Sequence, residues 1–157
     1  ELANGEKIPT LEQYLQAARK TKLELVLEVK PHATPEADAE AVRKIVEMIG
    51  KYGLTKRVTY ISFSFHALKE LAPAKTPIMY LGGGTLPEDL KKMGMTGYDF
   101  NYWVFQNNPT WLHSIKWLKM ASNVWTVNNP VEMLWVIENG FDFITTDRPD
   151  LFLRLVR

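Results

Sequence analysis

The sequence predicts an α/β fold built on a parallel sheet, and three observations support this class. Strand-like and helix-like segments alternate six times along the chain. Their spacing of roughly 20–35 residues is typical of parallel strands joined by helices. Several strand-like segments carry polar residues at alternate positions, as strands do when one of their two faces lines the inside of a barrel. At 157 residues, the chain is long enough to bury the core of one domain.

The first predicted helix and strand set the pattern. Thr10 can cap a helix over residues 11–18, and Gln13 completes a capping box. The strand at residues 23–30 then alternates strictly, because successive strand side chains point to opposite faces. One face favours packing against helices and consists of Leu23, Leu25, Leu27 and Val29. The other face presents charged groups to whatever the strand lines, and consists of Glu24, Val26, Glu28 and Lys30.

Five further strand–helix units follow. Apolar periodicity and helix-entry prolines predict helices over residues 36–51, 66–71, 87–92, 109–119, 130–138 and from Pro149 to about 156. β-favouring runs predict strands over residues 57–63, 77–81, 97–101, 122–128 and 141–146. Gly53 and Gly140 are expected to end two of the helices. The aromatic stretch at 98–105 is expected to serve mainly packing.

Two closures are open to such a chain. A doubly wound open sheet needs strands that are apolar on both faces. A (β/α)8 barrel needs eight units and typically about 250 residues, so six units in 157 residues fit a barrel without its first quarter. Polar residues at one strand parity favour the barrel: Glu24, Glu28, Lys30, Asn123 beside Trp125, and Asp142. Residues 1–157 are therefore predicted to form the third to eighth units of a TIM-type barrel that lacks its first two strands in this chain.

Composition excludes several classes of function. A net charge of +1 gives no electrostatic footprint for nucleic acid or an anionic membrane surface. The absence of cysteine excludes disulfides, thiolate metal sites and cysteine nucleophiles, and leaves the compartment undecided between cytoplasmic and periplasmic or secreted. No apolar run reaches the roughly 18 residues that would span a membrane. The polar opening segment without an initiator Met is expected to be a cut inside a longer protein, or a processed product.

A series of short motifs resembles one known family. In chain order these are Leu27-Glu28-Val29-Lys30, Tyr60-Ile61-Ser62-Phe63, Tyr80-Leu81, Val124-Trp125-Thr126-Val127-Asn128 and the run from Asp142 to Pro149. Together they resemble the C-terminal three quarters of a glycerophosphodiester phosphodiesterase, over essentially the whole chain. The resemblance implies a TIM barrel that hydrolyses small-molecule glycerophosphodiesters to glycerol 3-phosphate and an alcohol, with a divalent cation as cofactor.

The resemblance also implies roles for individual residues. Glu28 matches the family's metal-binding carboxylate on this strand, and a carboxylate oxygen suits Mg²⁺ or Ca²⁺. Lys30 matches the lysine that meets the substrate phosphate, where a compact cation offsets the anionic charge. Trp125 matches a tryptophan that lines the substrate pocket, and Ser62 and Phe63 match a motif at the pocket wall.

One departure from the family is expected to matter. The His-Arg-Gly motif, an acidic pair and a His-Asp motif, which would bring the family's two catalytic histidines, have no match here. The three histidines His32, His66 and His113 lie in other contexts, so no catalytic residue is assigned to this chain. We expect an N-terminal segment or a second chain to complete the barrel and supply these groups.

Alternative interpretations of the same residues stay open. Glu28 and Lys30 can form a plain ion pair at a solvated strand end. The chain can also be a non-catalytic truncated barrel that acts as a binding or assembly module. In that case another chain, for example a second copy in a homo-oligomer, would cover the open edge strands, which associate readily unless they are paired.

Overall fold

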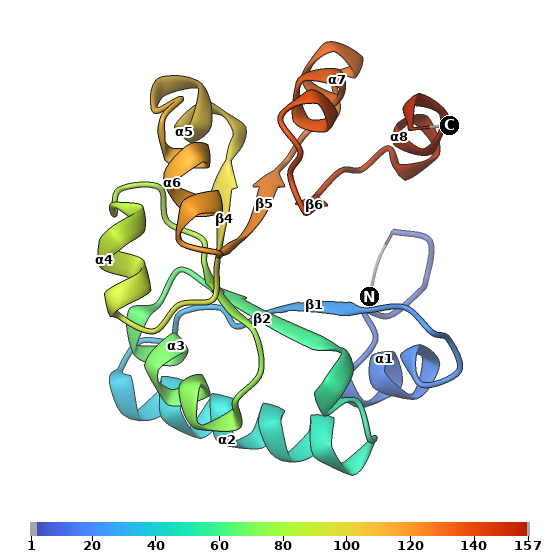
Figure 1. The fold of residues 1–157 in the computed structure, drawn as a ribbon. Coiled ribbons are helices and arrows are strands. Elements are labelled where there is room, and N and C mark those ends of the chain that lie inside the picture. The colour runs from blue at the N-terminus through green and yellow to red at the C-terminus, as the bar shows by residue number, and fades with distance from the viewer. Residues whose placement is uncertain (1–2, 157) are drawn as a thin grey trace.

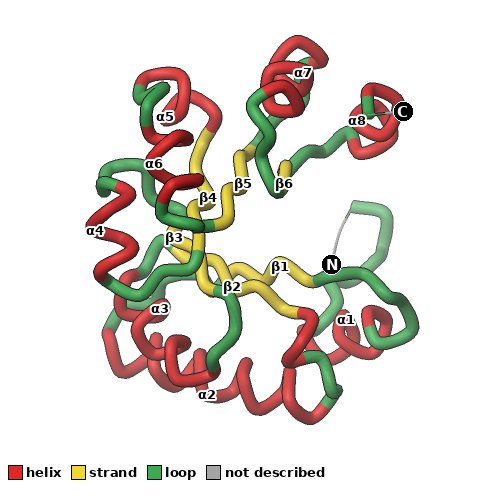
Figure 2. Tube along the Cα trace, viewed as in Figure 1, coloured by secondary structure: helices red, strands yellow, loops and turns green. Residues whose placement is uncertain are grey.

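The computed structural model describes residues 3–156 and contains one six-stranded parallel sheet (Figures 1 and 2). Each strand pairs with the next strand in the chain, in the order β1-β2-β3-β4-β5-β6. The strands are β1 Leu25–Glu28, β2 Val58–Ser62, β3 Ile78–Tyr80, β4 Gly97–Asn101, β5 Ala121–Trp125 and β6 Phe143–Ile144. The predicted α/β class and the six strands in sequence order are confirmed.

Helices connect the strands and lie on the outer side of the sheet. They are α1 Leu11–Ala18, α2 Pro35–Lys51, α3 Phe65–Leu71, α4 Pro87–Lys92, α5 Tyr102–Asn107, α6 Trp111–Trp117, α7 Pro130–Glu138 and α8 Pro149–Leu155, with short 3₁₀ turns at Thr55–Arg57 and Ala72–Ala74. Figure 1 shows the sheet curling about an axis with these helices outside it. A doubly wound sheet would carry helices on both faces, so the structure is a curled half-barrel. Its completion to eight strands stays a prediction.

The alternation predicted for the first strand is present. Leu25, Leu27 and Val29 contribute to the core between sheet and helices, whereas Glu28 and Lys30 line a pocket on the opposite face. Leu23 lies before the strand begins and is exposed. The apolar face of this strand therefore orients its charged face toward the inside of the half-barrel.

Helix ends follow the sequence rules. Thr10 and Gln13 form the predicted capping box of α1, with the Thr10 hydroxyl accepting from Gln13 N at 3.2 Å. Gly53 and Gly140 follow α2 and α7 with φ of 69° and 62°, a left-handed conformation that costs glycine little. Within residues 3–156, we find no helix with the length and apolar character needed to cross a membrane.

The structure differs from the sequence prediction at three places. The aromatic stretch at 98–105 contains an additional helix, α5, which the Asn101 side chain caps by accepting from Trp103 N. The last strand is only two residues long. Asp142 precedes that strand, and its carboxylate accepts hydrogen bonds from Ser122 N and Oγ at 2.8 and 3.0 Å. Asp142 therefore caps the amino ends of the last strands and does not line the lumen near their carboxyl ends, as its parity had suggested.

Candidate active site

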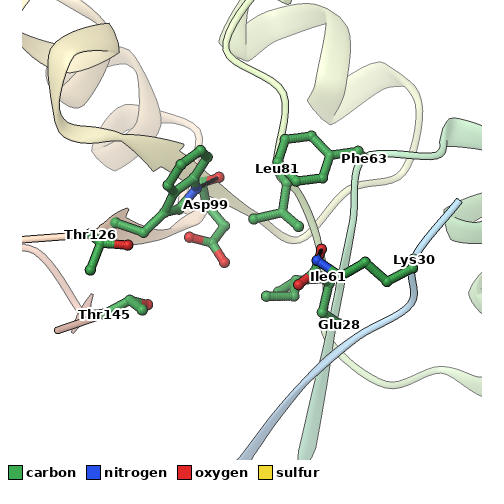
Figure 3. Close-up of a pocket in the computed structure, with 9 residues that line it drawn as sticks. Glu28, Lys30, Ile61, Phe63, Leu81, Asp99, Thr126 and Thr145 are labelled. Carbon is green, nitrogen blue, oxygen red and sulfur yellow. Dashed lines mark hydrogen bonds and ion pairs between the residues drawn. The ribbon is translucent and has the colours of Figure 1, made fainter. Parts of the chain in front are cut away.

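A pocket of about 260 Å³ opens where the carboxyl ends of the strands converge inside the half-barrel (Figure 3). Parallel α/β barrels carry their functional groups at this end. This volume is slightly smaller than the roughly 300–1,000 Å³ of typical small-molecule sites. The lining residues lie on β1, β2, β4 and β5 or in the segments that follow β1, β2, β3, β5 and β6: Glu28, Lys30, Ile61, Phe63, Leu81, Asp99, Trp125, Thr126 and Thr145.

Lys30 and Glu28 form an ion pair at one side of this pocket. The Lys30 Nζ lies 2.8 Å from Glu28 Oε1, and the two side chains are 75% and 29% exposed. Both project from the same face of β1 and its extension because they are two residues apart. The predicted neighbours are thus brought together, with the ammonium more accessible than the carboxylate. An anion that enters the pocket can reach Lys30 from solvent.

Asp99 lies on β4 and points into the space between Glu28 and Thr145 (Figure 3). Its side chain is 1% exposed, and neither carboxylate oxygen has a hydrogen-bond partner among residues 3–156. Burial raises the pKa of Asp99 to about 7; the nearby Asn123 amide offsets part of this rise, and the Glu28 carboxylate adds to it. Asp99 is therefore a buried acid poised to change charge near neutral pH.

Sequence reasoning missed Asp99, although one signal was present. The strand alternates Tyr98 and Phe100, which are buried in the core, with Gly97, Asp99 and Asn101. A lone carboxylate at the centre of such a strand faces the lumen if the apolar neighbours face the helices.

Two aromatic side chains form one wall of the pocket. Phe63 and Trp125 meet edge to face, with ring centroids 6.0 Å apart. The Trp125 indole is fixed further because its Nε1 donates to the Asp99 carbonyl oxygen at 2.8 Å. Both residues lie in the pocket lining, where the sequence placed them.

Ser62 lies behind the pocket wall and is not among the lining residues. Its side chain is fully buried; the hydroxyl donates to the Val29 carbonyl at 2.6 Å and accepts from Ser64 N at 3.0 Å. It shares a strand parity with Tyr60, which belongs to the core, whereas Ile61 and Phe63 face the pocket. The hydroxyl thus links the ends of β1 and β2 from the helix side of the sheet.

The three histidines lie outside the pocket lining. The His32 Nδ1 lies 3.0 Å from the buried Asp38 carboxylate, which also accepts a hydrogen bond from the Ser64 hydroxyl at 2.6 Å. The Ser64 contact, followed by those from His32, lowers the pKa of Asp38. His66 and His113 belong to the outer helices α3 and α6. The contacts among His32, Asp38 and Ser64 connect the loop after β1 to the start of α3.

The pocket holds two carboxylates that could contact a cation. Glu28 is partly exposed and Asp99 is buried with both oxygens free of protein partners among the described residues. Within residues 3–156, no group of three or more His, Cys, Asp or Glu side chains is placed to hold a metal ion. A hard divalent cation accepts one or two protein carboxylates with water or substrate oxygens as its other ligands, so the donor set fits such an ion in part.

Solved structures of other proteins share this fold. A crystal structure of a glycerophosphodiester phosphodiesterase from Parabacteroides distasonis matches with a TM-score of 0.95 and 45% identity, over 99% of this chain and 67% of that one. An Oleispira antarctica phosphodiesterase, solved in complex with the product sn-glycerol-3-phosphate, shares the fold with a TM-score of 0.80 at 18% identity, over 94% of this chain and 61% of that one.

Sequence comparison points the same way. A curated glycerophosphodiester phosphodiesterase from Caldanaerobacter subterraneus subsp. tengcongensis is 27% identical, in an alignment that covers 98% of this chain and 63% of that protein. The chain thus spans somewhat less than two thirds of this curated relative. The model of the glycerophosphoryl diester phosphodiesterase family matches residues 1–151, and the chain therefore belongs to that family.

Proposed function

We propose that this chain forms the greater part of a metal-dependent phosphodiesterase that hydrolyses glycerophosphodiesters to glycerol 3-phosphate and an alcohol. The observation that carries this proposal is the pocket in which an accessible Lys30 is paired with Glu28 at 2.8 Å. Family membership supports the reaction class. The sn-glycerol-3-phosphate bound to the Oleispira antarctica relative supports the substrate class.

Charge in the pocket supports a divalent cation, with Mg²⁺ and Ca²⁺ both suitable. If Lys30 turns to a substrate phosphate, Glu28 loses its 2.8 Å partner and the pocket is left with two carboxylates, Glu28 and Asp99. A divalent cation offsets that charge. Glu28 is the residue of this chain proposed to hold the ion, with further ligands from outside the chain. A bound ion would polarise a phosphoryl oxygen and thereby make the phosphorus atom easier for water to attack.

The residues of this chain bind and orient the substrate in this scheme. Lys30 holds a phosphate oxygen and stabilises the charge that develops there as a water oxygen bonds to phosphorus and the bond to the alcohol oxygen breaks. The Phe63–Trp125 wall limits access of water from one side. The alcohol takes up a proton as it leaves. Because the histidines of this chain lie outside the pocket lining, we propose that the proton donor and the general base come from a further segment or a second chain, and that this chain alone is inactive.

A second candidate is a non-catalytic binding or assembly module, which the two outer strands favour. β1 and β6 each pair with one neighbour only within the described residues. Unpaired strand edges invite association, so this role predicts dimers or larger assemblies of the chain by light scattering. In the enzyme, two further strands would cover the same edges.

Release of glycerol 3-phosphate from glycerophosphocholine by the full-length protein tests the proposal. We expect turnover with Mg²⁺ or Ca²⁺, loss of turnover with a chelator, and recovery when the cation is returned. Turnover that is insensitive to the chelator would contradict the metal dependence. Absence of turnover with either cation, from protein shown to be folded, would contradict the proposed reaction. Turnover by residues 1–157 alone would contradict the need for further residues.

A further inference from the structure

Asp99 places a buried carboxyl group in the pocket. Both its oxygens lack a partner among residues 3–156, and its side chain is 1% exposed. Leaving a buried carboxylate unpaired costs several kcal/mol. Asn123, its register neighbour on β5, donates instead to Thr145 Oγ1 at 3.2 Å. The carboxylate therefore gains most from a hydrogen-bond donor that enters the pocket.

Charge decides which part of a phosphodiester can occupy this position. A phosphate oxygen beside Asp99 would be repelled, whereas Lys30 attracts it on the Glu28 side of the pocket. The substrate is thereby oriented, with its phosphate at Lys30 and an uncharged or cationic arm at Asp99.

The surroundings of Asp99 favour an uncharged arm with hydroxyl groups. Thr126 and Thr145 line the same part of the pocket and offer hydroxyls that can both donate and accept. The Trp125 indole, tied to the Asp99 carbonyl at 2.8 Å, provides an apolar surface for C–H groups. A polyol satisfies such a set of groups, because it presents hydroxyl donors and carbon-bound hydrogens together.

We propose that Asp99 binds the hydroxyl groups of the glycerol arm of the substrate and thereby selects glycerol-containing diesters. This assignment rests on the proposed function and names the residue that recognises the glycerol part of the substrate. Asp99 accepts hydrogen bonds from the glycerol hydroxyls, and it takes no part in breaking the phosphorus–oxygen bond.

Matched substrates test the assignment in the full-length protein. We would compare glycerophosphocholine with propylphosphocholine, which lacks the glycerol hydroxyls, and with glycerophosphoethanol, whose alcohol is uncharged. Because a hydrogen bond to a charged group is worth about 1.5–3 kcal/mol, Asp99→Asn should lower kcat/KM for both glycerol-containing diesters about 10–100-fold. Turnover of propylphosphocholine should not change. Asp89→Asn, an exposed carboxylate in an ion pair on α4, is the control and should behave as wild type.

Three results would overturn the assignment. An equal loss of kcat/KM for propylphosphocholine would show that Asp99 does not bind the glycerol hydroxyls. A loss of kcat/KM confined to choline-containing diesters would show that Asp99 binds an ammonium group. A loss of Mg²⁺ affinity in Asp99→Asn as large as that in Glu28→Gln, measured by calorimetry, would show that Asp99 is a cation ligand. Circular dichroism verifies the fold, and Asp99→Ser replaces Asp99→Asn if the latter does not fold.

Binding measurements test the role of Asp99 without turnover, so a failure of this assignment can be distinguished from a failure of the proposed reaction. With Mg²⁺ present, wild type should bind glycerol 3-phosphate more tightly than propyl phosphate, and Asp99→Asn should bind the two equally. Equal affinities in wild type, or the same preference in Asp99→Asn, would overturn the assignment even if no diester is hydrolysed.

Discussion

The indole Nε1 of Trp125 donates a hydrogen bond to the backbone carbonyl oxygen of Asp99, across 2.8 Å. This contact joins neighbouring strands β4 and β5 at the pocket, in addition to the ladder that pairs Asn101 with Trp125. It fixes the orientation of the Trp125 indole beside the buried Asp99 carboxyl group, and thereby the position of the aromatic wall formed by Phe63 and Trp125.

Replacing Trp125 with Phe tests the value of that contact. The ring remains but the donor is lost, so we expect kcat/KM for glycerophosphocholine to fall about 3–10-fold, in line with a neutral hydrogen bond of roughly 1 kcal/mol. Trp125→Leu also removes the edge-to-face contact with Phe63 and should lose more. Steady-state kinetics on both variants measure the order. Wild-type kinetics in Trp125→Phe would show that the hydrogen bond does not position the wall.

Asp99 should make the protein less stable as the pH rises. Because burial raises the pKa of Asp99 to about 7, the folded state holds a proton between about pH 4 and 7 that the unfolded state releases. Stability is therefore highest at the acid end of this window and falls by on the order of 3–4 kcal/mol towards its upper end. Glu28 faces Asp99 and adds to the effect, whereas Asn123 reduces it; Lys30 lies on the same pocket.

Urea unfolding of wild type and Asp99→Asn at pH 5 and pH 8, with chelator present, measures this dependence. The variant should gain stability relative to wild type as the pH rises. Asp38, whose pKa is lowered chiefly by Ser64, has the opposite dependence, but it is present in both proteins and cancels in the difference. A wild-type minus variant difference that stays constant between the two pH values would contradict the buried charge.

Glu28 should determine cation affinity. We expect Glu28→Gln to bind Mg²⁺ and Ca²⁺ at least about tenfold more weakly, because hard cations prefer charged carboxylate oxygens to an amide. Calorimetric titration of the full-length protein gives the affinity directly. Glu24→Gln is a matched control, since Glu24 is exposed and lies outside the pocket lining. Equal affinities in the two variants would remove Glu28 from the cation site.

Ser62 should affect folding more than substrate affinity. Ser62→Ala leaves the Val29 carbonyl and the Ser64 N–H without their partner at the ends of β1 and β2. We expect a loss of about 1–3 kcal/mol in unfolding free energy and an unchanged KM, measured by urea unfolding and steady-state kinetics. A raised KM at unchanged stability would support the direct substrate contact that the sequence motif suggested.

The sequence predicted the architecture well because strand alternation is a local property. In β1 the parity of Leu25, Leu27 and Val29 oriented Glu28 and Lys30 correctly, and the same rule brings Phe63 into the pocket. The same alternation predicts that the Ser62 side chain faces the helices, because adjacent strand residues point to opposite faces. The family motif contains Ser62 and Phe63 together, and for that reason both were assigned to the pocket wall.

The parts that were missed depend on tertiary contacts. The run Tyr102–Asn107 contains β-favouring aromatics, yet it forms α5, because the Asn101 cap and packing on the core override local preference. Asp99 was overlooked since its importance arises from what is absent around it: no partner among residues 3–156 reaches its oxygens. Such an absence is a property of the assembled strands and cannot be read from one segment.

Lys30 provides the most direct test of the proposed phosphate site, because the chain contains a closely matched control. Lys92 pairs with Asp89 at 3.0 Å and is 76% exposed, while Lys30 pairs with Glu28 at 2.8 Å and is 75% exposed. The measurement is kcat/KM for glycerophosphocholine in Lys30→Met and Lys92→Met of the full-length protein. We predict a loss of about 100-fold or more for Lys30→Met and none for Lys92→Met. Equal activity in both variants would contradict a phosphate site at Lys30.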